Sequence, residues 1–201
     1  MTGARPAATL SGGVALLERA VSYTLGQLQV VTSAGLSRRT PCARWDLCAL
    51  LEHMNDSLAA LQEALDLRCV GPGADTGIGV GLDDPAADLV AALRGRAGRL
   101  LGALAGTDDD LVHIGGCPIP TSIVTSAGAI DVAVHGWDVA RACGSTQPIP
   151  EQLAQDMLEI SPLLVTRDDR PERFAAPIPV PPQASASDRL VAYLGRDPAL
   201  A

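Results

Sequence analysis

Hydrophobic residues recur at intervals of three and four along two segments near the N-terminus. Residues 10–31 carry one such series, made of Val14, Leu17, Val21, Leu25, Leu28 and Val31. After a break over residues 33–41, a second series consists of Leu47, Leu50, Met54, Leu58, Leu61 and Leu65. This spacing predicts two amphipathic helices. Asp46 is well placed to cap the second, because its carboxylate can accept backbone N–H groups of the first turn.

Further helices are predicted in the second half of the chain. Pro85 is a favoured first-turn residue and begins a helix that runs to about Leu104. A fourth helix spans residues 121–143 and stops at Gly144, a residue suited to helix C-termini. Shorter helices are expected over residues 151–164 and 188–194.

The segments between these helices lack a helical pattern. Residues 70–84 are rich in Gly and Asp and are expected to form a loop, and residues 111–114 a short strand or an extended connection. Five prolines within residues 170–182 exclude regular helix there. We therefore predict an all-α fold in a single domain over residues 1–201. A four-helix up-down bundle occupies about 10–165, and a proline-rich irregular C-terminal wrap with a short helix occupies about 166–201.

Composition supports a helical globular protein and excludes several classes of partner. Aromatic residues make up only 2% of the chain and hydrophobic residues 47%, so the core must be built from Ala, Leu and Val. The net charge of −8, without a basic stripe, argues against nucleic acid as a partner. No apolar stretch reaches about 18 residues, so no membrane span is expected.

Composition also narrows the chemistry and the compartment. All 15 basic residues are arginine, which excludes Schiff-base chemistry on lysine and the lysine of a phosphate-binding loop. The first residues do not resemble a signal peptide. The five cysteines form no Cys-x-x-Cys pair and are expected to be reduced thiols of a cytoplasmic protein.

One pair of side chains suggests a metal site. His135 follows Asp131 by four residues inside the predicted fourth helix, a spacing that places the two side chains one above the other. An imidazole and a carboxylate so placed can hold one cation between them, and Asp138 continues the same helix face. His53 lies at the edge of the second helix's leucine stripe, and facing helices could bring it to this pair. Without a metal, the pair would be an ordinary ion pair and His53 a satisfied core residue.

Other residues offer weaker alternatives. Cys117 follows two glycines and lies near His113 in sequence, as a Cys–His nucleophile would. Cys42, Cys48, Cys69 and Cys143 are expected to be small core or boundary residues. The acidic run 108–110 is expected to be a solvated turn rather than a cation site, and the glycine-rich run 77–81 a plain loop, since no strand precedes it and no Lys follows.

Two ordered motifs resemble those of the mycothiol-dependent maleylpyruvate isomerase family, within the DinB-like metalloprotein superfamily. The first is Thr40-Pro41-Cys42 followed by Trp45-Asp46 and Leu50-Leu51-Glu52-His53. The second is Asp131-Val132-Ala133-Val134-His135-Gly136-Trp137-Asp138-Val139-Ala140-Arg141-Ala142. The ending, Asp188-Arg189-Leu190 with Leu194-Gly195-Arg196-Asp197-Pro198, is similar to that of a short actinobacterial subgroup described as metal-binding.

The resemblance implies a four-helix bundle that holds a divalent ion, often zinc, by three ligands. These ligands fall on His53, Asp131 and His135. Three protein ligands leave an open position, the pattern of catalytic rather than structural zinc. In the family this position is thought to receive the thiol of mycothiol. The isomerase has Glu where this chain has Asp131, and the resemblance does not extend to the isomerase's additional C-terminal domain, so maleylpyruvate isomerisation is not the expected reaction.

The leading hypothesis is therefore an enzyme that depends on a divalent metal, with zinc as the expected ion. It activates a small thiol such as mycothiol for transfer to a small electrophilic metabolite or for isomerisation of that metabolite. Asp138 would orient a neighbouring residue or the substrate. A second hypothesis is a thiol-independent isomerase, cyclase or hydrolase in which the ion acts as a Lewis acid. A third is a non-catalytic metal-binding module.

Overall fold

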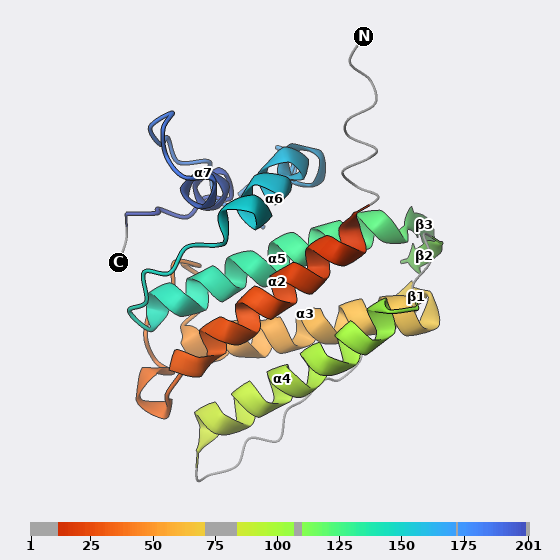
Figure 1. The fold of residues 1–201 in the computed structure, drawn as a ribbon, viewed down its shortest axis with the longest axis horizontal. Helices are drawn as coiled ribbons and strands as arrows, with labels where there is room; N and C mark the ends of the chain where they lie inside the picture. The colour runs from red at the N-terminus through yellow and green to blue at the C-terminus, as the bar shows by residue number, and fades with distance from the viewer. Residues whose placement is uncertain (1–11, 71–83, 107–109, 172, 200–201) are drawn as a thin grey trace.

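The computed structural model describes residues 12–70, 84–106, 110–171 and 173–199. Four long helices form a bundle: α2 (Gly13–Gln27), α3 (Leu47–Leu67), α4 (Pro85–Leu104) and α5 (Thr121–Ala142). The all-α four-helix bundle predicted from the sequence is confirmed (Figure 1). None of the helices formed by the described residues combines the length and the apolar composition of a membrane span.

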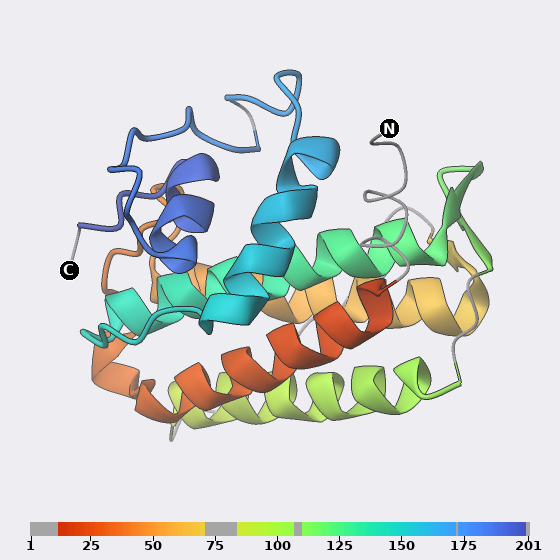
Figure 2. The same cartoon turned by 45° about the horizontal axis from the view of Figure 1, so that its top comes forward.

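The helices of the bundle run in two directions. α3 and α4 run one way and α2 and α5 the other (Figures 1 and 2). The consecutive helices α3 and α4 are therefore parallel, which departs from the alternating up-down order predicted from the sequence, because helical periodicity does not fix the direction in which a helix packs. The strands that follow these two helices agree with this, because β1 (Cys69–Val70) pairs in parallel with β2 (Leu111–Ile114). α5 packs against α2 and α3, and α4 lies against α3 and α2.

Short structures complete the bundle's ends. The 3-10 turns η1 (Leu28–Val30) and η2 (Ser33–Gly35) follow α2. β3 (Cys117–Pro120) pairs antiparallel with β2, so the sheet order is β1-β2-β3. Residues 111–114 are thus a strand, and Val70, expected to begin a loop, lies in β1. Residues 71–83, with the glycine-rich run 77–81, lie outside the described residues.

The C-terminal part packs on the outside of the bundle. α6 (Glu151–Leu164) crosses α5, and α7 (Ala186–Tyr193) packs against α6 (Figure 2). The described residues between 170 and 182 contain no helix, as the prolines predict. Ser185 caps α7 by accepting a hydrogen bond from the Asp188 N–H.

α5 is the central element of the molecule. Nine consecutive residues, 132–140, are all buried, because α2 and α3 cover one side of this helix and α6 covers another. A helix that is buried on nearly all sides cannot show a clear amphipathic stripe. The buried side chains of His135 and Asp138 therefore find their hydrogen-bond partners inside the protein.

Small residues let α2 approach α5 closely. A Cβ added at Gly136 would lie 3.1 Å from Thr24 Cβ and 3.2 Å from Thr24 Cα, and nearer still to the Thr24 hydroxyl. That hydroxyl donates a hydrogen bond to the Val132 carbonyl at 2.9 Å. The absence of a side chain at Gly136 therefore permits the close approach of α2 to α5 that the Thr24 hydrogen bond requires.

We expect Gly136→Ala to lower the free energy of unfolding by about 1–3 kcal/mol, because the added methyl forces the two helices apart. Gly26→Ala is the matched control: Gly26 lies in α2, and a Cβ there would meet nothing within 4 Å. This control should gain about 0.5–1 kcal/mol, since Ala restricts the unfolded chain. Urea denaturation measures both. Shifts of the two variants in the same direction would contradict the close packing of α2 on α5.

Candidate metal centre

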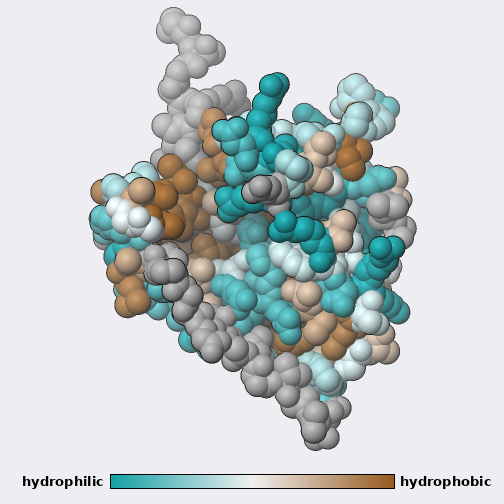
Figure 3. Space-filling model, turned by 180° about the vertical axis from the view of Figure 1, so that it is seen from behind, coloured by the Kyte–Doolittle hydropathy of each residue, from teal (hydrophilic) through white to brown (hydrophobic). Residues whose placement is uncertain are grey.

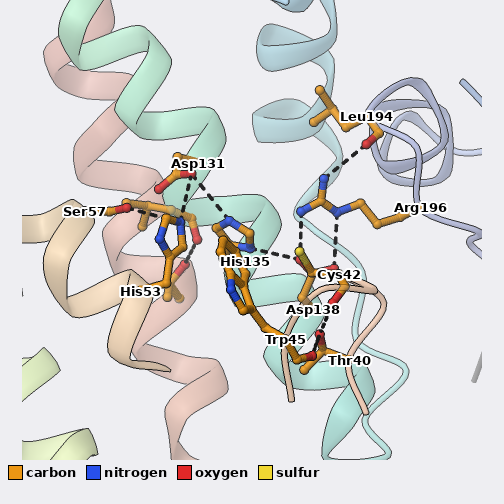
Figure 4. Close-up of polar contacts among 12 residues, drawn as sticks. Thr40, Cys42, Trp45, His53, Ser57, Asp131, His135, Asp138, Leu194 and Arg196 are labelled. Atoms are coloured by element: carbon orange, nitrogen blue, oxygen red, sulfur yellow. Dashed lines mark hydrogen bonds and ion pairs between the residues drawn. The ribbon is translucent and has the colours of Figure 1, made fainter. Parts of the chain in front are cut away.

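Two helices of the bundle supply the candidate ligands. Asp46 caps α3 by accepting a hydrogen bond from the Ala49 N–H at 2.9 Å, as predicted, and His53 follows about two turns later. Asp131 and His135 lie one turn apart on α5, which packs against α3. The three side chains therefore converge between α3 and α5 (Figure 4).

The ligand atoms are spaced as a small cation requires. Asp131 Oδ1 lies 3.5 Å from His135 Nε2 and 3.9 Å from His53 Nε2. All three ligand atoms lie within 4.8 Å of one another. Two atoms that are each about 2.1 Å from a tetrahedral zinc ion lie about 3.4 Å apart. The separations and the two-imidazole, one-carboxylate donor set thus fit a divalent ion of the zinc type.

The hydrogen bond to Asp138 fixes which nitrogen His135 presents. Asp138 is fully buried, and its Oδ2 lies 3.0 Å from His135 Nδ1 and 3.0 Å from Arg196 Nη2. A carboxylate paired with a guanidinium is ionised and can only accept, so Nδ1 must carry the proton. In neutral His135, Nε2 then presents a lone pair to the carboxylate of Asp131. Two acceptors facing each other need a cation or a proton between them.

Trp45 and Ser57 hold the other histidine. The Trp45 ring stacks on the His53 ring with centroids 4.2 Å apart and an angle of 28° between the planes. Ser57, one turn after His53 on α3, places its hydroxyl 3.5 Å from His53 Nε2. Packing against an indole restricts the imidazole to few orientations, which lowers the entropy lost when it binds a ligand.

The surroundings of Asp131 keep its carboxyl ionised. Desolvation raises the pKa of this carboxyl, but the charge on protonated His135 and the hydrogen bonds of His53 and Ser57 outweigh it and lower the pKa to about 2. Asp131 is therefore an anion at neutral pH. An ionised carboxylate beside two imidazoles attracts a cation strongly.

The candidate centre opens onto a cleft. The side chains of His53 and Asp131 are 33% and 37% exposed, whereas that of His135 is only 7% exposed. His53, Ser57 and Asp131 line a cleft of about 450 Å3 between α3, α5, the hairpin and the segment that follows α6. The candidate ligands thus face a space that can receive a small molecule.

A second set of ligand-type atoms lies on the other side of the His135 ring. Cys42, His135 and Asp138 bring one ligand atom each within 4.8 Å of one another. Both oxygens of Asp138 already face Arg196, whose guanidinium would repel a cation. Burial raises the pKa of the Cys42 thiol, which keeps it neutral. This set fits a hydrogen-bonded network better than a metal site.

The structure keeps Cys117 and His113, the two members of the possible Cys–His pair, apart. In the hairpin His113 pairs with Pro118 and Ile114 with Cys117. Side chains alternate between the faces of a sheet, so those of His113 and Cys117 point to opposite sides. Gly115 and Gly116 form the turn with φ of +57° and +82°, a conformation that glycine tolerates. The hairpin therefore carries no Cys–His pair.

The remaining candidates also have structural roles or lie outside the described residues. Asp110 is exposed and pairs with Arg68 at 3.4 Å, as in a solvated turn, and residues 108 and 109 are not described. Cys42, Cys48 and Cys143 are half-buried. Cys69, expected in the core or at its boundary, is exposed on the short strand β1.

Two residues at the centre were not assigned a role from the sequence. Ser57 follows His53 by four residues on one helix, a spacing that could have indicated the contact. Arg196 lies 58 positions from Asp138, and nothing in the spacing indicates that they meet.

Comparisons with known proteins find similarity over the part of the chain that carries the candidate ligands. A family model described as the mycothiol maleylpyruvate isomerase N-terminal domain matches residues 17–140, which include His53, Asp131 and His135. The fold is similar to that of the crystal structure of the mycothiol-dependent maleylpyruvate isomerase, with a TM-score of 0.56 and 19% sequence identity, over 76% of this chain and 69% of that chain. No curated protein matches the chain significantly.

Proposed function

The chain belongs to the family of the mycothiol maleylpyruvate isomerase N-terminal domain, and from this membership we propose that it is a divalent-metal-dependent enzyme that activates a small thiol, mycothiol or a close relative. Its reaction would be transfer of the thiol to a small electrophilic metabolite or isomerisation of that metabolite. One observation carries the proposal: Nε2 of His53, Oδ1 of Asp131 and Nε2 of His135 lie within 4.8 Å of one another beside a cleft.

In this proposal His53, Asp131 and His135 hold the ion, which is zinc or a similar divalent metal. Asp138 holds the proton on His135 Nδ1 and so keeps the lone pair on Nε2. Arg196 holds Asp138 in place by donating a hydrogen bond to its Oδ2. Trp45 orients His53 by stacking on it. Such outer contacts fix ligand orientation and increase ligand basicity.

When bound, such an ion would lower the pKa of a thiol that binds to it, so that a thiolate is present at neutral pH. The protein's contribution is to orient the thiol and the electrophile. Most of the cleft lining is hydrophobic, so a bound thiol and electrophile would displace water from these walls.

The exposure of the candidate ligands favours an enzyme over a non-catalytic metal-binding module. A non-catalytic metal-binding module needs no space beside its ligands, whereas His53 and Asp131 line a cleft of about 450 Å3. This supports an enzyme over a sealed structural site. A thiol-independent isomerase, cyclase or hydrolase would use the same three ligands, so only a thiol-specific measurement separates it from the proposal.

The thiol hypothesis predicts a spectroscopic result. Mycothiol added to the cobalt-substituted protein should produce an intense sulfur-to-metal charge-transfer band in the near ultraviolet, with release of a proton, because thiolate is a good ligand for a borderline-soft ion. The band should saturate at a lower concentration of mycothiol than of 2-mercaptoethanol. Absorption titration measures both.

Two controls define this result. S-methylated mycothiol should give neither the band nor the proton, because its sulfur cannot become a thiolate. His53→Ala should abolish the band, because the ion is no longer held. If mycothiol behaves no differently from 2-mercaptoethanol, the thiol-independent enzyme becomes the better hypothesis.

A further inference from the structure

The cleft beside the candidate metal centre has walls from four parts of the chain. α3 and α5 form its floor, the β2–β3 hairpin closes one end, and the segment after α6 closes another. In the view from behind, hydrophobic residues gather at the end of the molecule that carries the hairpin, and the surface there is hollowed (Figure 3). Its volume of about 450 Å3 lies within the range of small-molecule sites.

Hydrophobic side chains make up most of the cleft lining. They include Leu61, Ile119, Ile123, Leu164 and Phe174. The polar residues His53, Ser57 and Asp131 occur together at the candidate metal centre, and Asp169 and Arg173 lie on the segment after α6. A molecule in the cleft would therefore touch polar groups at two places and hydrocarbon elsewhere.

The charges of the cleft do not match a multiply charged anion. Among the described residues that line it, Arg173 is the one side chain with a permanent positive charge. Its side chain is 76% exposed and already pairs with Asp169, whose carboxylate lies 3.4 Å from Nη1. Asp169 also accepts hydrogen bonds from the Thr166 N–H and hydroxyl, which hold it in place. Arg173 is thus screened by water and neutralised by its neighbour.

A divalent ion bound by the Asp131 carboxylate and two neutral histidines would keep one positive charge, which could balance one further negative group. In the proposed function that group is the thiolate, so the second reactant meets Asp131, Asp169 and apolar walls without a free cation. A carboxylate buried there would lose its hydration without gaining a partner.

We infer that the electrophile which reacts at this site is an uncharged molecule with an apolar body, rather than a dicarboxylate. The inference rests on the proposed function for the cleft as the electrophile's site and for the thiolate that balances the ion. The hydrophobic lining and the paired state of Arg173 belong to the protein whether or not an ion is bound.

A set of three unreactive probes tests the inference on the zinc-loaded protein saturated with mycothiol, so that the thiolate and not a carboxylate of the probe occupies the open position of the ion. Dimethyl phthalate, monomethyl phthalate and phthalate share one skeleton and carry zero, one and two negative charges. We expect the diester to bind saturably and phthalate to bind about tenfold more weakly or worse, because its second carboxylate has no partner. Calorimetric titration measures the affinities, and metal content is determined before and after each titration.

Three variants tie this binding to the cleft. Ala127 is exposed on α5 and lines the cleft, so Ala127→Trp should block the diester while the metal content stays unchanged. Ala15→Trp, at an exposed α2 position that does not line the cleft, is the matched control and should bind the diester normally. Ala127→Arg should raise the affinity for phthalate, because it adds an unpaired cation to the wall.

The outcomes separate this inference from the proposed function. Phthalate binding as tightly as the diester, or diester binding that Ala127→Trp leaves unchanged, would overturn the inference even if the protein holds zinc. A protein that takes up no zinc but binds the diester in the cleft would overturn the metal-dependent function and leave the inference standing.

Discussion

His135→Ala should lose most of the protein's divalent metal, with affinity lowered about 100-fold or more. Loss of a residue that only supports a ligand costs about 10–100-fold, so loss of a ligand should cost at least the upper value. The effect is expected to be large because His135 is the least exposed of the three candidate ligands and is held by Asp138 at 3.0 Å. Metal analysis after equilibrium dialysis against zinc measures the stoichiometry, which should be about one ion per wild-type chain.

The matched control for this variant is His113→Ala. His113 is exposed on the hairpin strand β2, apart from the candidate ligands, so the same substitution there should leave the metal content unchanged. Both variants should keep the helical circular dichroism of the wild type. Equal metal content in His135→Ala and the wild type would rule out His135 as a ligand.

Arg196→Met should lower the free energy of unfolding of the metal-free protein by about 3–5 kcal/mol, because it leaves a buried carboxylate without its cation. Arg196 is buried and sends Nη2 to Asp138 Oδ2 at 3.0 Å, and its Nη1 donates to the Leu194 carbonyl at 3.1 Å. The guanidinium therefore joins the C-terminal segment to α5. Urea denaturation in the presence of a chelator measures the loss without a contribution from bound metal.

Arg19→Met is the matched control, because Arg19 also pairs with an aspartate but does so at the surface. Its Nη2 lies 2.6 Å from Asp156 Oδ2, and the two side chains are partly exposed. Removal of such a pair should cost less than about 1 kcal/mol. Similar losses in the two variants would show that Asp138 does not depend on Arg196.

The helices could be predicted from the sequence because their determinants are local. Asp46 caps α3, and Pro85 begins α4 as predicted. Residues 121–143 were predicted as a helix, and α5 ends one residue earlier, at Ala142. Capping, side-chain spacing and proline each act within a few residues, so they can be recognised along one segment.

The position of the candidate centre was predicted in part. The interval of four between Asp131 and His135 already brings their side chains together on one helix, and 3.5 Å between Oδ1 and Nε2 agrees with it. His53 was placed beside them by a family resemblance and by the expectation that helices of a bundle face each other. The packing of α3 on α5 is what brings His53 Nε2 to 3.9 Å from Asp131.

By itself, the sequence determined the helices, the spacing of Asp131 and His135 on one of them and the family to which the chain belongs. Only the tertiary structure decided that α3 and α4 run parallel, that His113 and Cys117 point apart, and that Arg196 reaches Asp138 across 58 positions. The cleft likewise depends on walls from four separate segments. The physical reason is range: capping and helical periodicity act between near neighbours, whereas burial of a charge and the shape of a cavity depend on segments that meet only when the chain has folded.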